Sequence, residues 1–206
     1  MTIGRIWSGL AVLALASAVS LPAAASPLTY VISPKSTDID FAVGILGLTT
    51  CEGAFSRFTG SLTIDLERPE RSAVSVQVDT HSAAMNWEQS GAMATSESYL
   101  DADHFPELRF VSKQVTVLES GKVRLDGDLT LHGVTHSESF EAELAERRWD
   151  GDHNGEEAAF AAIGTVKRSD YGMDSDLSVL DDKVTFKIRA RVILSPTELV
   201  SNAHRP

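Results

Sequence analysis

The sequence has little cysteine and lacks the short motifs that usually mark an enzyme. Its single cysteine, Cys51, excludes an intramolecular disulfide, so a hydrophobic core must hold the fold together. No Gly-x-Ser-x-Gly elbow, phosphate-binding glycine loop, His-Glu-x-x-His or Cys-x-x-Cys occurs in the 206 residues. We therefore expect no catalytic residues. A catalytic site built from scattered residues is the alternative that the sequence leaves open.

Positive charge is also scarce. The chain carries 18 Lys and Arg against 29 Asp and Glu, for a formal net charge of −11. A surface this acidic repels phosphate backbones and anionic bilayers, and no dense basic cluster offsets it. The composition therefore predicts no nucleic-acid partner.

Long hydrophobic runs are missing everywhere except at the N-terminus. There, Arg5 precedes an apolar run over Leu10–Val19, and the small residues Ala23–Ala25 follow. This order is typical of a cleavable signal peptide. The run is too short and interrupted for a membrane span, which needs about 20 apolar residues. We expect residues 1–25 to be a signal peptide, residues 26–194 a periplasmic domain without stable membrane insertion, and residues 195–206 a polar tail.

Export makes a direct prediction about the mature N-terminus. Small side chains at the end of the signal peptide suit the peptidase, so protein recovered from the periplasm should begin at Ser26. N-terminal sequencing tests this. Recovery of an intact Met1 in the membrane fraction would contradict it.

Apolar residues in the rest of the chain follow the period of a β-strand. Ile39, Phe41, Val43 and Ile45 fall on one face of a strand that begins near Asp38. Such alternation is typical of antiparallel strands with one buried and one solvated face. The same period recurs in 58–64, 74–78, 123–131 and 184–188. The pattern predicts an all-β antiparallel barrel or sandwich.

One segment departs from the strand pattern. Residues 83–100 are rich in Ala, Met, Glu and Gln and poor in β-branched residues, which favours one short helix. Gly91 within the segment disfavours a helix, because glycine has a low helix propensity.

Two segments resemble metal sites without completing them. Asp150–Gly155 copies the first half of a calcium loop, but the twelfth position is Ala161 instead of the required Glu. His132 and His136 are four residues apart, yet Gly133 favours a turn between strands, and no third ligand lies nearby in the sequence. We therefore expect a hairpin loop and a turn, and no metal.

Several stretches, in matching order and spacing, resemble the YceI family of exported, lipocalin-like, polyisoprenoid-binding proteins. They are Tyr30–Gly60, Phe105–Phe110, Gly127–Thr135 and the distinctive Arg168-Ser-Asp-Tyr-Gly-Met173. Together they extend from Tyr30 to about Val192. The chain departs from the family at Ser36 and Ile45, where members often carry His, and at Ser90–Ser96, which replaces a charged segment.

The resemblance implies a lipocalin-like barrel of about eight strands that holds an apolar isoprenoid, either a polyprenyl lipid or an isoprenoid quinone. It implies no required cofactor. Pattern alone favours a barrel filled by its own side chains, and the resemblance favours a cavity. We expect the ligand to contact an apolar lining of Phe41, Val43, Phe58, Leu62, Met85, Met93, Tyr99, Phe110, Leu129, Leu131, Phe160, Tyr171, Met173, Phe186 and Ile188.

Three further expectations follow. Arg168 and Asp170 should stabilise a turn and make no ligand contact, and Cys51 should be a buried thiol without a catalytic role. The protein should be a monomer or a homodimer. The alternative to a lipid carrier is a ligand-free interaction module that partners a membrane redox protein.

Overall fold

The computed structural model describes residues 27–65, 67–86, 91–152 and 155–194. The predicted signal peptide and the predicted polar tail lie outside the described residues.

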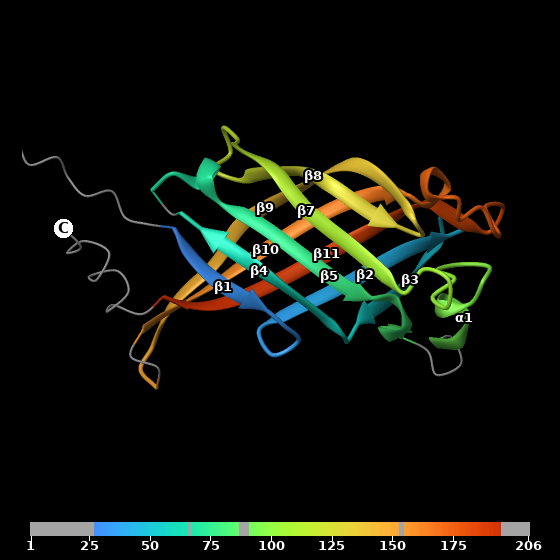
Figure 1. Ribbon diagram of the computed structural model, residues 1–206, viewed down its shortest axis with the longest axis horizontal. Coiled ribbons are helices and arrows are strands. Elements are labelled where there is room, and N and C mark those ends of the chain that lie inside the picture. The colour runs from blue at the N-terminus through green and yellow to red at the C-terminus, as the bar shows by residue number, and fades with distance from the viewer. Residues whose placement is uncertain (1–26, 66, 87–90, 153–154, 195–206) are drawn as a thin grey trace, which may run out of the picture.

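The described residues form one antiparallel sheet of 11 strands. Its order is β1-β4-β5-β7-β8-β9-β10-β11-β2-β3-β6. The strands are β1 (Leu28–Ile32), β2 (Thr37–Ile45), β3 (Thr49–Phe55), β4 (Phe58–Ile64), β5 (Ala73–Asp79), β6 (Ala83–Met85), β7 (Glu107–Val117), β8 (Val123–Leu131), β9 (Val134–Asp150), β10 (Gly155–Lys167) and β11 (Leu180–Leu194). Figure 1 shows the sheet curling around a single interior, with the short helix α1 (Gly91–Thr95) at one end.

The predicted fold class is confirmed, and the strand count is corrected from about eight to 11. Two of the additional strands are short and lie at the edges of the sheet: β1 pairs with β4, and β6 pairs with β3. The third additional strand arises because the chain changes its strand partner at Ser56 and Arg57, between β3 and β4. Strand β3 pairs with β2 as far as Phe55, and β4 pairs with β1 from Gly60 onward. An alternating pattern does not show where a strand changes its neighbour.

The outer strand β1 and the segment just before the outer strand β6 make contacts outside the strand ladders. Tyr30 of β1 packs on a cluster formed by Ile64, Ala158 and Val192, which links β1 to β10 and β11. Near the other end, the hydroxyl of Ser82 accepts a hydrogen bond from the backbone N–H of Arg57 (3.0 Å). The side-chain contact of Tyr30 therefore holds the edge strand β1 against β10 and β11, and the Ser82 hydroxyl holds the segment before β6 to the connection between β3 and β4.

Alternation in β2 and β11 confirms the predicted faces. Ile39 and Phe41 are buried while Asp38 and Asp40 are exposed. In β11, Phe186 is buried between the half-buried Val184 and Ile188, and Lys187 and Arg189 are exposed. The two strands are neighbours, with Phe186 opposite Phe41. Their apolar faces therefore form one continuous wall of the interior.

Close packing of this wall depends on a glycine. Phe41 lies opposite Gly53 of β3, and a Cβ atom at Gly53 would collide with the Phe41 ring. The ring instead approaches Phe55, with the two ring centroids 5.1 Å apart.

The helix predicted over residues 83–100 is only partly right. Ala83–Met85 form β6, because Gly53–Phe55 offers them a strand edge, and this tertiary pairing overrides their helix propensity. The α-helix is confined to Gly91–Thr95. Residues 87–90 lie outside the described residues. Within the described ranges, no helix has the length and apolar character that crossing a membrane requires.

Candidate ligand-binding site

Two cavities lie against the apolar face of the curled sheet. One, which we call the α1-end cavity, has a volume of about 110 Å³. The other, which we call the large cavity, has a volume of about 280 Å³ and reaches Gly121 in the turn between β7 and β8. Figure 1 places that turn at the opposite end of the barrel from α1. The two cavities therefore occupy successive parts of the same interior.

Three buried side chains separate the cavities. Phe55, Leu108 and Phe186 line both of them and are each only 5–6% exposed. They come from β3, β7 and β11, three strands that are distant in sequence. The interior is thus neither a fully packed core nor one open tube. It consists of two apolar spaces divided by a layer of packed side chains.

The structure places most of the predicted lining residues on the walls of these cavities. Those on the α1-end cavity are Phe41, Val43, Met85, Met93, Tyr99, Leu131, Met173 and Phe186. Those on the large cavity are Leu62, Phe110, Leu129, Phe160, Phe186 and Ile188. Their contact with a ligand stays a prediction.

Two of the predicted lining residues, Phe58 and Tyr171, line neither cavity. Phe58 is buried in the surrounding hydrophobic core and lines neither cavity. Tyr171 is fully buried, and its hydroxyl donates to a carboxylate oxygen of Glu138 (2.9 Å). Burial, followed in size by this hydrogen bond, raises the pKa of Tyr171, so the hydroxyl stays a donor. A buried tyrosine hydroxyl usually has a hydrogen-bond partner, and here that partner is Glu138.

Sequence reasoning missed Phe55 and Leu108, two of the three dividing side chains. The sequence contained a sign that Phe55 points inward, because Cys51, Gly53 and Phe55 occupy every second position of β3. The structure buries all three. Leu108 lies in β7 between Phe105 and Phe110, two residues of a matched stretch. Nothing in the sequence next to either residue indicates that it lines the same two cavities as Phe186.

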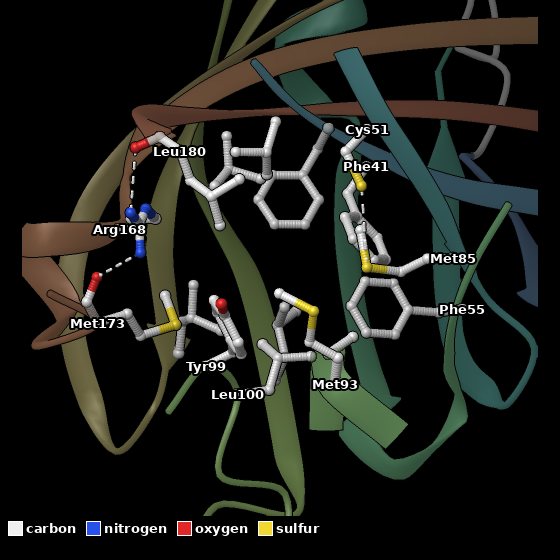
Figure 2. Close-up of a pocket in the computed structure, with 16 residues that line it drawn as sticks. Phe41, Cys51, Phe55, Met85, Met93, Tyr99, Leu100, Arg168, Met173 and Leu180 are labelled. Carbon is white, nitrogen blue, oxygen red and sulfur yellow. Dashed lines mark hydrogen bonds between the residues drawn. The ribbon is translucent and has the colours of Figure 1, made fainter. Parts of the chain in front are cut away.

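Sulfur atoms gather at the α1-end cavity. Cys51, Met85, Met93 and Met173 all line it, and Figure 2 shows them around its walls. The Cys51 thiol donates to the Met85 sulfur over 3.9 Å. The predicted burial of Cys51 is confirmed, since it is 3% exposed, and burial raises the pKa of its thiol. A protonated thiol and flexible thioethers form a polarizable lining that adapts to the shape of an apolar ligand.

A buried arginine closes the other side of this cavity. Arg168 is 4% exposed, and its guanidinium donates to four backbone oxygens (Figure 2 shows two of these bonds). The acceptors are Met173 (3.1 Å), Ser175 (2.6 Å), Leu180 (3.1 Å) and Asp181 (3.1 Å). The side chain therefore fastens the loop between the 3-10 helix Arg168–Tyr171 and β11, as predicted for a turn. It also lines the cavity.

A second polar contact holds the same loop. The hydroxyl of Tyr99 donates to Asp176 (2.6 Å). Burial, with this hydrogen bond as the next cause, raises the pKa of Tyr99 to about 12. The tyrosine therefore stays a hydrogen-bond donor at physiological pH and ties the segment after α1 to the loop before β11.

His132 and His136, the two histidines considered above as metal ligands, lie next to backbone oxygens of the 3-10 helix Arg168–Tyr171. His132 and Gly133 form the turn between β8 and β9, with φ angles of 51° and 74°. His132 Nδ1 lies 2.9 Å from the backbone oxygen of Tyr171, and His136 Nε2 lies 2.9 Å from that of Asp170. Among the described residues, no group of three or more His, Cys, Asp or Glu is arranged to hold a metal ion.

The predicted hairpin loop at Asp150–Gly155 is described only in part, because residues 153–154 lie outside the described residues. In the described part, the Asp150 carboxylate accepts a hydrogen bond from the backbone N–H of Asp152 (3.0 Å). The loop joins β9 to β10, which pair from Asp150 and Gly155 onward.

Residues 30–192 match the model of the YceI-like domain. The chain belongs to this family. The YceI-like domain of this chain is 35% identical to a UPF0312 protein of Vibrio parahaemolyticus over 159 residues, which are 76% of this chain and 84% of the relative. It is 33% identical to a UPF0312 protein of Pseudomonas putida over 165 residues, or 79% and 85% of the two chains.

Solved structures share the fold of this YceI-like domain. BcnA of Burkholderia cenocepacia superposes with a TM-score of 0.68 at 19% identity, covering 78% of this chain and 99% of BcnA. A polyisoprenoid-binding domain from Saccharophagus degradans superposes with a TM-score of 0.55 at 10% identity, covering 83% and 100%. At these identities the likeness shows the fold alone.

Proposed function

We propose that this protein is an exported, periplasmic binding or carrier protein for a long apolar isoprenoid lipid, a polyprenyl chain or an isoprenoid quinone. The observation that carries the proposal is the pair of apolar cavities that follow one another along the barrel interior. Together they reach the lower end of the roughly 300–1,000 Å³ typical of small-molecule pockets. The name of the Saccharophagus domain, a polyisoprenoid-binding domain, supports the ligand class.

The energetics of an isoprenoid tail fit such a lining. Each buried methylene contributes about 0.8 kcal/mol, so one isoprene unit of five carbons contributes roughly 3–4 kcal/mol before costs. Association costs about 4–15 kcal/mol. A few buried units therefore give tight binding without any polar contact, and no catalytic group is needed for this function.

Solvent extraction of the native protein tests the proposal. Protein purified from the periplasm without detergent should release a lipid in near-stoichiometric amount, identified by mass spectrometry. Protein that is well folded but releases no lipid would instead support the ligand-free interaction module.

A cavity-filling variant makes this experiment sharper. Ala162 lines the large cavity, so Ala162→Phe should occupy part of it and reduce the recovered lipid several-fold, at a cost of about 1–3 kcal/mol in unfolding free energy. Ala73 is exposed on β5, and Ala73→Phe is the matched control that should leave the lipid unchanged. Equal lipid from both variants would mean that the lipid binds elsewhere.

A further inference from the structure

Exposed aliphatic and thioether side chains lie at the end of the barrel that holds α1. We call them the mouth patch: Leu46 (60% exposed), Leu48 (87%), Met93 (40%), Leu177 (43%) and Val179 (44%). They lie on the turn between β2 and β3, on α1 and on the loop before β11, which Figure 1 shows at the same end of the molecule. The backbone N–H of Leu46 donates to the backbone oxygen of Val179 (2.9 Å), so two of the three segments are directly joined.

The backbone at Leu46 has a conformation that is unfavourable for leucine. Leu46 and Gly47 occupy left-handed conformations, with φ angles of 51° and 65°, and the N–H of Leu48 donates to the backbone oxygen of Ile45. Turns of this kind favour Asn, Asp or Gly, because a Cβ atom is unfavourable at positive φ. The largely exposed Leu46 side chain gains little from burial in return. The turn thus presents two leucines to the outside at a local cost in stability.

The mouth patch is continuous with the α1-end cavity. Met93 belongs to both, since it lines the cavity and is 40% exposed. Leu180 lines the cavity directly after Val179 of the patch. A molecule leaving the cavity past Met93 would therefore meet the patch before it met open water.

The composition of the patch fits a lipid bilayer better than a protein. Its members are all aliphatic or thioether side chains on projecting turns, whereas the energetic centres of protein interfaces are enriched in Trp, Tyr and Arg. The exposed Asp174 and Asp176 in the same loop disfavour an anionic surface and are compatible with zwitterionic head groups. Exposed apolar side chains of this type enter the boundary between head groups and acyl chains.

We propose that the mouth patch docks on a zwitterionic lipid bilayer, so that an isoprenoid passes between the bilayer and the α1-end cavity without crossing water. This inference rests on the proposed carrier function. Crossing water would expose every methylene of the tail, and docking removes that barrier.

Transfer kinetics test the docking. Protein loaded with a fluorescent geranylgeranyl probe is mixed with phosphatidylcholine vesicles in a stopped-flow instrument. Transfer by docking should speed up in proportion to vesicle concentration. Vesicles that also contain phosphatidylglycerol should receive the probe more slowly. A transfer rate that does not depend on vesicle concentration would overturn the proposal, because it would indicate release into water.

Paired variants separate the patch from general surface hydrophobicity. The double variant Leu46→Asn, Leu48→Ser removes both leucines while keeping a residue suited to positive φ. It should transfer the probe about tenfold more slowly with unchanged equilibrium affinity. The control, Val117→Ser with Ile163→Ser, changes residues that are 50% and 49% exposed elsewhere and should match the wild type. Wild-type transfer by the patch variant would overturn the docking proposal. Failure of the wild type to bind the probe would instead contradict the carrier function.

Discussion

Replacing Arg168 by methionine should lower the free energy of unfolding by about 4 kcal/mol or more, because four buried or partly buried backbone oxygens would lose the guanidinium donor. Arg168 is 4% exposed and donates to two backbone oxygens of the loop before β11 and to those of the first two residues of β11. Each buried polar group left without a partner costs about 1–3 kcal/mol. Methionine fills a similar space and supplies no donor. Urea denaturation monitored by circular dichroism measures the loss.

Two further variants define the origin of this effect. Arg168→Lys keeps the positive charge but offers a compact ammonium group instead of a planar fork, so it should recover only part of the stability. Arg189→Met changes an exposed arginine on the outer face of β11 and should alter stability by no more than about 0.5 kcal/mol. If Arg168→Met cost less than 1 kcal/mol, the loop would be held by other contacts, such as the bond between Tyr99 and Asp176.

The sequence predicted the faces of strands well because burial repeats along a strand every second residue. The assignments of Phe41 in β2 and Phe186 in β11 needed only that local period, and both are confirmed as buried. The structure of Ala83–Met85, by contrast, is determined by a pairing with residues that are distant in the sequence. Their composition favoured a helix, and the free edge of β3 made them a strand.

The division of the interior could not be predicted for a related reason. It depends on Phe55, Leu108 and Phe186 each lying between the two cavities, although they come from three strands separated by long stretches of chain. Periodicity shows that a side chain points inward, and it does not show which others it meets or how much space they leave. Tyr171 illustrates the same limit, since it is fully buried and yet lines neither cavity.

Replacing Phe186 by alanine should join the two cavities and change which lipid the protein retains. The ring lines both cavities and is 6% exposed, with its centroid 6.5 Å from that of Phe140. In a tightly filled core, Phe→Ala costs about 3–5 kcal/mol. Because empty space already borders this ring, it makes fewer contacts, and we expect a smaller loss of about 2–3 kcal/mol. The variant should fold and co-purify with a different or longer-chain lipid, identified by extraction and mass spectrometry.

The neighbouring residue supplies the control that makes this result decisive. Lys187 points to the outer face of β11, where its ammonium lies 3.5 Å from a carboxylate oxygen of Glu52. An exposed ion pair of this kind contributes about 0–1 kcal/mol, so Lys187→Ser should change stability little and leave the retained lipid unchanged. If Phe186→Ala lost 3–5 kcal/mol and neither variant released lipid, the dividing layer would belong to a filled core. If Lys187→Ser proved more damaging in both measurements, the inward and outward faces of β11 would have to be exchanged, because adjacent side chains on a strand point to opposite sides of the sheet.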